Sequence, residues 1–186
     1  MKRTLLALAF VALPLVALPF AAFAADDLKY SYVEADYLDL DHGVDGPALR
    51  GSIDLGKTGA YLTGSYAWLD GAGNGVNLRA HELGAGYHHG IGARTDLIGE
   101  VAYRKAEAHG ASAEGARASV GVRGALGKRG EAFVKGNYYD AADYHGDATG
   151  TVGGQFKVNN TWGVTAEVEA GNGDTAWLAG VRASFK

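Results

Sequence analysis

The sequence has 186 residues, 29 glycines, no cysteine and a formal net charge of −4. The acidic balance argues against a nucleic-acid partner, because such partners require basic surfaces that match the phosphate backbone. The absence of cysteine excludes a disulfide framework and a lipid-modified cysteine. No segment after residue 24 approaches the roughly 20 apolar residues of a membrane-spanning helix.

The first residues have the three-part pattern of a secretory signal peptide. A basic start (Lys2, Arg3) precedes an apolar stretch and the small-residue cleavage site Ala22-Phe23-Ala24. We therefore predict that residues 1–24 are a signal peptide and that residues 25–186 form one exported domain of 162 residues (186 − 24). That domain holds 15 of the 17 basic residues and all 21 acidic residues, so its net charge is 15 − 21 = −6.

Apolar and polar residues alternate with period two through most of the exported domain, which is typical of strands with one apolar face. Ten segments follow this pattern in chain order: 29–38, 48–55, 60–69, 78–88, 96–104, 115–126, 131–139, 149–158, 161–170 and 175–185. Together with export, they predict an all-β fold, an antiparallel transmembrane up-and-down β-barrel with ten strands in the outer membrane. Eight strands remain an alternative if two weak segments are loops.

The polar face of these segments carries charges of both signs. Such a face predicts a polar barrel interior cross-linked by ion pairs, while the apolar face meets lipid. A soluble barrel would alternate equally well, and the predicted export favours the membrane alternative. The predicted lumen charges are Glu34, Asp36, Arg50, Glu82, Glu100, Arg104, Arg117, Arg123, Lys135, Glu167 and Arg182, and Asp54, Glu131, Lys157 and Glu169 share their face.

Aromatic residues cluster near the strand ends on the apolar face. If the N-terminus lies in the periplasm, one group falls at the outer ends of the strands and another at the inner ends. Rings at both headgroup levels are the girdles of a transmembrane barrel. The predicted outer girdle is Tyr37, Trp68, Tyr103, Tyr138 and Trp177, and the predicted inner girdle is Tyr87, Phe156, Trp162 and Phe185.

The connections between the segments also alternate in length. Tight turns are expected on the periplasmic side, with residues 88–94 as a longer exception. Longer polar loops are expected on the outer side at residues 39–47, 105–114 and 140–147, where they would form contact surfaces. Short periplasmic turns and long surface loops are the usual asymmetry of outer-membrane barrels.

No pattern in the sequence points to catalysis. His42, His109 and His145 would lie in outer loops near acidic residues, where imidazole and carboxylate could bind a divalent metal, and His88-His89 would lie in a turn. Solvated loop histidines are the simpler interpretation, since no pair has the spacing of metal ligands. We assign no catalytic, metal-binding or cofactor-binding residue and expect no enzymatic activity.

Several strand motifs resemble a family of small outer-membrane barrels from plant-associated and opportunistic Gram-negative bacteria. The family was first described through a proposed activator of a rice immune receptor and quorum-sensing factor. The matching motifs are Tyr30-Ser31-Tyr32-Val33-Glu34, Gly86-Tyr87-His88-His89, Val101-Ala102-Tyr103-Arg104-Lys105, Gly153-Gly154-Gln155-Phe156-Lys157, Trp162-Gly163-Val164 and the closing segment from Trp177 to Phe185. One departure is Lys186, which follows the closing aromatic residue that such barrels usually end on.

The resemblance implies a barrel of the cell outer membrane, shed in part in vesicles, that influences biofilm, motility or virulence. Its expected partners are outer-membrane lipids and the barrel assembly machinery, with no cofactor and an unidentified surface partner. We expect a structural or cell-surface interaction role. A narrow small-solute channel and a soluble periplasmic ligand-binding β-barrel remain alternatives.

Overall fold

The computed structural model describes residues 28–41, 43–71, 77–108, 110–141 and 144–185, so the predicted signal peptide lies outside the described residues. These residues form ten strands and one short 3₁₀ turn, η1 (Gly56–Thr58). The strands are β1 (Ser31–Leu40), β2 (Val44–Asp54), β3 (Ala60–Gly71), β4 (Asn77–Gly92), β5 (Thr95–Ala108), β6 (Ala111–Leu126), β7 (Gly130–Ala141), β8 (Tyr144–Lys157), β9 (Trp162–Gly171) and β10 (Asp174–Phe185). Among the described residues, no helix is long and apolar enough to cross a membrane.

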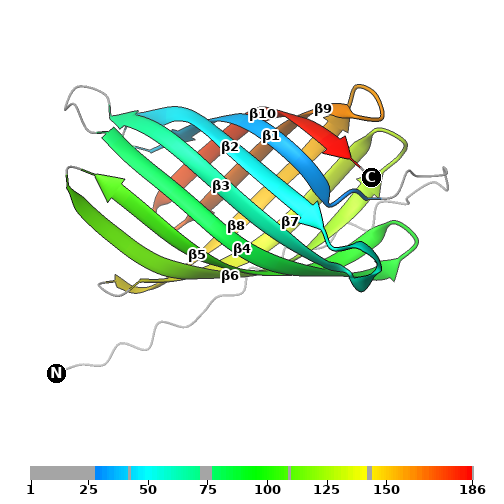
Figure 1. Ribbon diagram of the computed structural model, residues 1–186, viewed down its shortest axis with the longest axis horizontal. Helices are drawn as coiled ribbons and strands as arrows, with labels where there is room; N and C mark the ends of the chain where they lie inside the picture. The colour runs from blue at the N-terminus through cyan, green and yellow to red at the C-terminus, as the bar shows by residue number, and fades with distance from the viewer. Residues whose placement is uncertain (1–27, 42, 72–76, 109, 142–143, 186) are drawn as a thin grey trace.

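The strands close into an antiparallel barrel (Figure 1). Each strand pairs with the next along the chain, and β1 pairs with β10 from Ser31 opposite Phe185 to Leu40 opposite Ala176. Closure satisfies the backbone groups that an open sheet would leave at its edges. The ten-strand prediction is therefore confirmed, and the eight-strand alternative is wrong.

Several predicted loops are shorter than expected, because the strands continue into them. The region 105–114 was predicted as a loop, but β5 runs to Ala108 and β6 begins at Ala111, with Gly110 at a positive φ of 80° in the turn. Likewise, β4 includes most of 88–94, and the connections within 39–47 and 140–147 are reduced by longer strands. Antiparallel pairing extends as long as both backbones stay extended, and polar residues on both faces hid these extensions.

The two faces of the barrel wall have opposite character. Leu83, Val101 and Val120 are exposed on the outside, at 69%, 63% and 61% of their surface. The carboxylate-bearing residue Glu34 is fully buried in the interior. A protein dissolved in water would place large aliphatic residues inside and its charges outside. The soluble barrel alternative requires an apolar interior, and the structure has the reverse arrangement.

The barrel has two ends. The terminal end is the one where β1 begins and β10 ends, and the opposite end is the other. All nine aromatic residues predicted to form girdles are exposed on the outer wall. Tyr37, Trp68, Tyr103, Tyr138 and Trp177 lie toward the opposite end, and Tyr87, Phe156, Trp162 and Phe185 lie toward the terminal end. The two groups therefore occupy opposite ends of the wall, as a pair of girdles requires.

Candidate functional site in the barrel lumen

The first ion-pair cluster centres on Arg50 of β2. Its guanidinium nitrogens lie 2.9 Å from Glu34 Oε1, 2.8 Å from Asp36 Oδ2 and 2.8 Å from Glu167 Oε1. Glu34 also accepts hydrogen bonds from Arg182, at 2.6 Å and 2.8 Å. Arg50 thus connects β2 to β1 and β9, and Arg182 adds β10, so the cluster cross-links four neighbouring strands from within the lumen.

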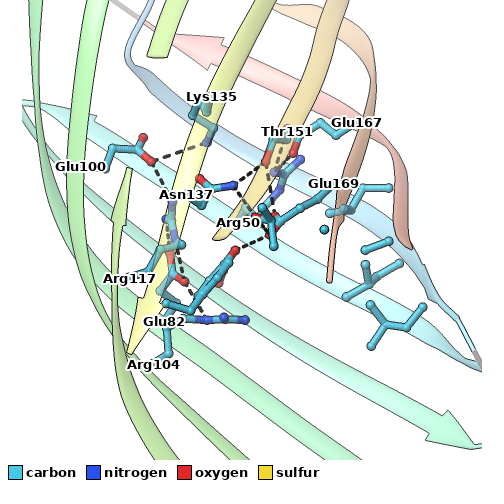
Figure 2. Close-up of a pocket in the computed structure, with 18 of the residues that line it drawn as sticks. Arg50, Glu82, Glu100, Arg104, Arg117, Lys135, Asn137, Thr151, Glu167 and Glu169 are labelled. Carbon is cyan, nitrogen blue, oxygen red and sulfur yellow. Dashed lines mark hydrogen bonds and ion pairs between the residues drawn. The ribbon is translucent and has the colours of Figure 1, made fainter. Parts of the chain in front are cut away.

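The second cluster joins β4, β5, β6 and β7 (Figure 2). Arg117 contacts Glu82 and, at 3.2 Å, Glu100. Arg104 Nε lies 3.1 Å from Glu82, and Lys135 Nζ lies 3.5 Å from Glu100. Each carboxylate therefore has two basic partners, which offsets part of the cost of removing the charges from water.

The third cluster lies near the terminal end, and every member of it is buried. Glu131 of β7 contacts Arg123 of β6, and Lys157 Nζ of β8 lies 2.7 Å from Glu131 Oε1. The side chains of all three are less than a tenth exposed. Charge-assisted hydrogen bonds of this kind are the stronger ones in proteins, so this cluster fills one side of the lumen firmly.

An aromatic contact extends this cluster across the barrel. The ring of Tyr30, which directly precedes β1, stacks on the His88 ring with centroids 3.9 Å apart. The Arg123 guanidinium lies 4.7 Å from the centroid of the same Tyr30 ring, within the range of a cation–π interaction. In a ring of ten strands β1 and β6 are diametrically opposed, so the contact between Tyr30 and Arg123 spans the whole lumen.

Two further contacts hold Tyr30 in place. Burial raises the pKa of its hydroxyl above the ordinary value, so the group stays protonated and donates a 2.8 Å hydrogen bond to Asp96 Oδ2. The Tyr61 ring packs at 5.1 Å between centroids and donates from its hydroxyl to Glu100 at 3.0 Å. We call Tyr30, Tyr61, His88, Asp96 and Arg123 the Tyr30 belt.

The position of Tyr61 depends on a glycine in the neighbouring strand. Gly86 of β4 pairs with Tyr61 of β3, and a Cβ built on Gly86 would overlap the Tyr61 ring. Glycine is the residue that leaves this space, since it has no side chain. The Tyr61 ring therefore lies against the β4 backbone at Gly86 and reaches into the belt.

The opposite half of the lumen is hollow instead of filled. A cavity of about 690 Å³ reaches from the β9–β10 connection at Asn172 down to Arg50 and Glu100. On its wall Glu169 accepts hydrogen bonds from the hydroxyls of Tyr139 and Thr149, at 2.5 Å and 2.6 Å. Thr151 donates to the same carboxylate at 3.3 Å. Within the described part of the chain, Glu169 forms no ion pair with Lys or Arg.

The structure brings all eleven predicted lumen charges into ion pairs. Glu34, Asp36, Arg123, Glu167 and Arg182 are buried, and Arg104 is the most open, with 46% of its side chain exposed beside the Tyr139 ring. The remaining five, Arg50, Glu82, Glu100, Arg117 and Lys135, are partly buried. Glu131, Lys157 and Glu169, which the sequence placed on the same face, also contact lumen residues.

The sequence did not indicate the Tyr30 belt. His88 and His89 were predicted in a turn, but both lie in β4, and the His88 ring packs inside the barrel. The period-two alternation held a signal for the belt that was missed. Tyr30, Tyr32 and Tyr61 occupy positions on the same face as the charged residues. His145, predicted in a loop, lies in β8, whereas His42 and His109 fall outside the described residues. The described residues hold no group of three or more His, Asp or Glu side chains placed to bind a metal.

A closed antiparallel barrel with an apolar exterior and an ionised interior defines the class, a β-barrel of the outer membrane. Among solved structures, the chain is similar to the KdgM porin (15% identity, TM-score 0.53, covering 83% of this chain and 99% of that one). It is equally similar to the KdgM porin in complex with disordered oligogalacturonate (16% identity, TM-score 0.53, covering 83% and 99%). These identities establish the shared fold alone.

The Neisserial surface protein A has 15% identity and a TM-score of 0.35, with coverage of 83% of this chain and 96% of that one. No protein-family model matches the chain. No curated protein matches it either.

Proposed function

We propose that this chain is a non-conducting barrel that serves as a structural or interaction protein of the cell surface. The observation that carries the proposal is the Tyr30 belt, because side chains from opposite walls touch across the lumen at the terminal end. Small barrels have interiors that side chains can fill, whereas barrels of roughly sixteen or more strands leave an aqueous channel. The first two ion-pair clusters line the cavity of the opposite half, and the third, with the belt, fills the lumen at the terminal end.

If the lumen is closed to solutes, the two ends of the barrel are the surfaces that can contact partners. Exposed charged side chains such as Asp39, Asp70 and Glu107 surround the opposite end, which we predict to face the outside of the cell. Membrane lipids and the assembly machinery are the partners expected during biogenesis. The family resemblance adds biofilm, motility and virulence as the processes in which to look for an effect. The proposal includes no catalytic step.

A narrow small-solute channel is the second candidate. The cavity of about 690 Å³ and its charged lining favour it, as does the similarity to the KdgM porin, whose complex with oligogalacturonate has been solved. For this candidate to hold, the Tyr30 belt would have to open.

Conductance in planar bilayers tests the two candidates. We expect the exported domain to be electrically silent, because the belt blocks the aqueous path. Tyr30→Ala removes the ring that joins His88 to Arg123, and we expect it to produce measurable conductance. Tyr37→Ala, the same substitution on the outer wall, is the matched control and should stay silent.

The outcomes separate the candidates clearly. Steady conductance of the unmodified barrel would overturn the non-conducting proposal in favour of the channel. Silence of both the unmodified barrel and Tyr30→Ala would keep the barrel non-conducting but show that the belt is not what closes it. A gel that compares boiled and unboiled samples verifies that each variant is folded.

A further inference from the structure

Among the described residues, the exposed charges at the terminal end are all basic. Lys57 in η1 and the turn residues Lys128 and Arg129 are exposed, and Lys29 and Arg94 are half-buried. We call these five residues the basic rim.

The described acids of the same end are buried or half-buried, and two of them are bonded to lumen side chains. Glu131 is buried against Arg123, Asp96 accepts a hydrogen bond from Tyr30, and Asp54 is half-buried. Among the described residues, none of the five rim side chains forms an ion pair with a carboxylate. Lys29 Nζ instead donates to the carbonyl oxygen of Asn160 at 2.6 Å. The positive charge of the rim is therefore not neutralised by carboxylates of the described residues.

The basic rim lies directly beside the apolar wall. Leu55 and Leu126 each precede a rim lysine by two residues, and they are 47% and 43% exposed. Ile91 precedes Arg94 by three residues and is 57% exposed. Aliphatic side chains on the outer wall face lipid tails, so cations two or three residues farther along stand at the level of the headgroups.

The opposite end has the reverse charge. Its exposed acids include Asp39, Asp41, Asp70, Glu107, Glu114 and Asp140. The cations there include Arg79, which is exposed, and Lys105, which lies 2.7 Å from Glu107 and 3.8 Å from Glu114. Positive charge is thus concentrated at one end of the barrel axis and negative charge at the other.

We propose that the basic rim binds the phosphodiester headgroups of anionic phospholipids in the leaflet around the terminal end. Unpaired cations beside an apolar surface attract anionic headgroups at short range, and salt screens the attraction. The same assignment orients the barrel, with the terminal end in the phospholipid leaflet and the acidic end toward the outer surface. This inference does not depend on whether the lumen conducts.

Spin-labelled lipids measure this selectivity directly. The exported domain is reconstituted in phosphatidylcholine vesicles with a trace of spin-labelled phosphatidylglycerol or spin-labelled phosphatidylcholine. Electron paramagnetic resonance then gives the share of each label that is immobilised around the barrel. We expect a preference for phosphatidylglycerol on the order of fivefold, which is the contribution of about one cation near a membrane surface. High salt should reduce it.

Two variants of the full exported domain isolate the basic rim. The triple variant Lys57→Gln, Lys128→Gln and Arg129→Gln should lose most of the preference. The matched control Arg79→Gln with Lys105→Gln, which removes cations at the opposite end, should keep it. The three rim side chains are exposed and unpaired, so the triple variant should fold, and its shift on an unheated gel verifies this.

Three results would overturn the proposal. One is an unmodified barrel without preference for the anionic label, and another is a triple variant that keeps the preference in full. The third concerns a different partner, the acidic peptide-bearing polymer of the cell wall. If purified wall sacculi bind the unmodified barrel but not the triple variant, while lipid selectivity is equal in both, the rim serves the wall and not the membrane.

Discussion

At the terminal end, the Tyr30 ring, the Arg123 guanidinium and the Glu131 carboxylate fill the lumen from wall to wall. In the opposite half, the same strands enclose a cavity of about 690 Å³. The two halves share the strand number and pairing, so barrel geometry does not decide whether the interior is open. The difference comes from side-chain size and from the partner of each charge.

The partners of two glutamates show this contrast best. Glu131 lies between Arg123 and Lys157, away from the solvent. Glu169 is held by the hydroxyls of Tyr139, Thr149 and Thr151. Hydroxyls can turn toward water, whereas a buried cation that loses its carboxylate has no replacement. In the filled half, loss of a carboxylate therefore leaves a buried cation without a partner. In the hollow half, water can replace the carboxylate as the partner of the hydroxyls.

The same substitution at these two glutamates tests that contrast and has the largest expected effect. Glu131→Ala leaves two cations buried without a carboxylate, so the free energy of unfolding should fall by about 3–5 kcal/mol. Glu169→Ala leaves hydroxyls beside a cavity and should cost only about 1–2 kcal/mol. Urea unfolding in lipid vesicles, followed by tryptophan fluorescence, measures both. Equal losses would show that the two halves are not stabilised differently.

A second pair of variants tests how tightly the filled half is packed. A Cβ on Gly86 overlaps the Tyr61 ring, while a Cβ on Gly150 in β8 meets nothing within 4 Å. Gly86→Ala should lower the free energy of unfolding by about 1–3 kcal/mol, as overpacking does. Gly150→Ala should change it by no more than about 0.5 kcal/mol. A Gly86→Ala barrel as stable as the Gly150→Ala control would mean that Tyr61 moves freely out of the belt.

Period-two alternation was enough to predict ten strands and the eleven lumen charges, because a side chain in a closed barrel points either in or out. Parity alone thus placed Arg50 and Glu167 on one face although 117 positions separate them. Which partners meet could not be predicted, since the contacts depend on the stagger of β1, β2, β9 and β10. That stagger comes from closure of the whole sheet.

The strand ends and the belt were missed for a related reason. Lys105 and Glu114 are polar residues, and polar residues on both faces are typical of loops, yet they pair opposite each other in β5 and β6. Alternation put Tyr30 on the face of the charged residues, but it did not tell which side chains meet across the barrel. The role of Tyr30 becomes evident only when His88 and Arg123, from distant strands, are found against its ring.

The smallest expected effect separates the bulk of Tyr30 from its hydrogen bond. Tyr30→Phe keeps the ring between His88 and Arg123 but removes the 2.8 Å hydrogen bond to Asp96. The free energy of unfolding should fall by about 0.5–1.5 kcal/mol, and the barrel should stay silent in planar bilayers because the ring still blocks the lumen. If Tyr30→Phe conducts as Tyr30→Ala is expected to, the hydroxyl and not the ring holds the belt closed. In that case the difference between the two halves of the lumen rests on one hydrogen bond to Asp96, and side-chain bulk contributes little to it.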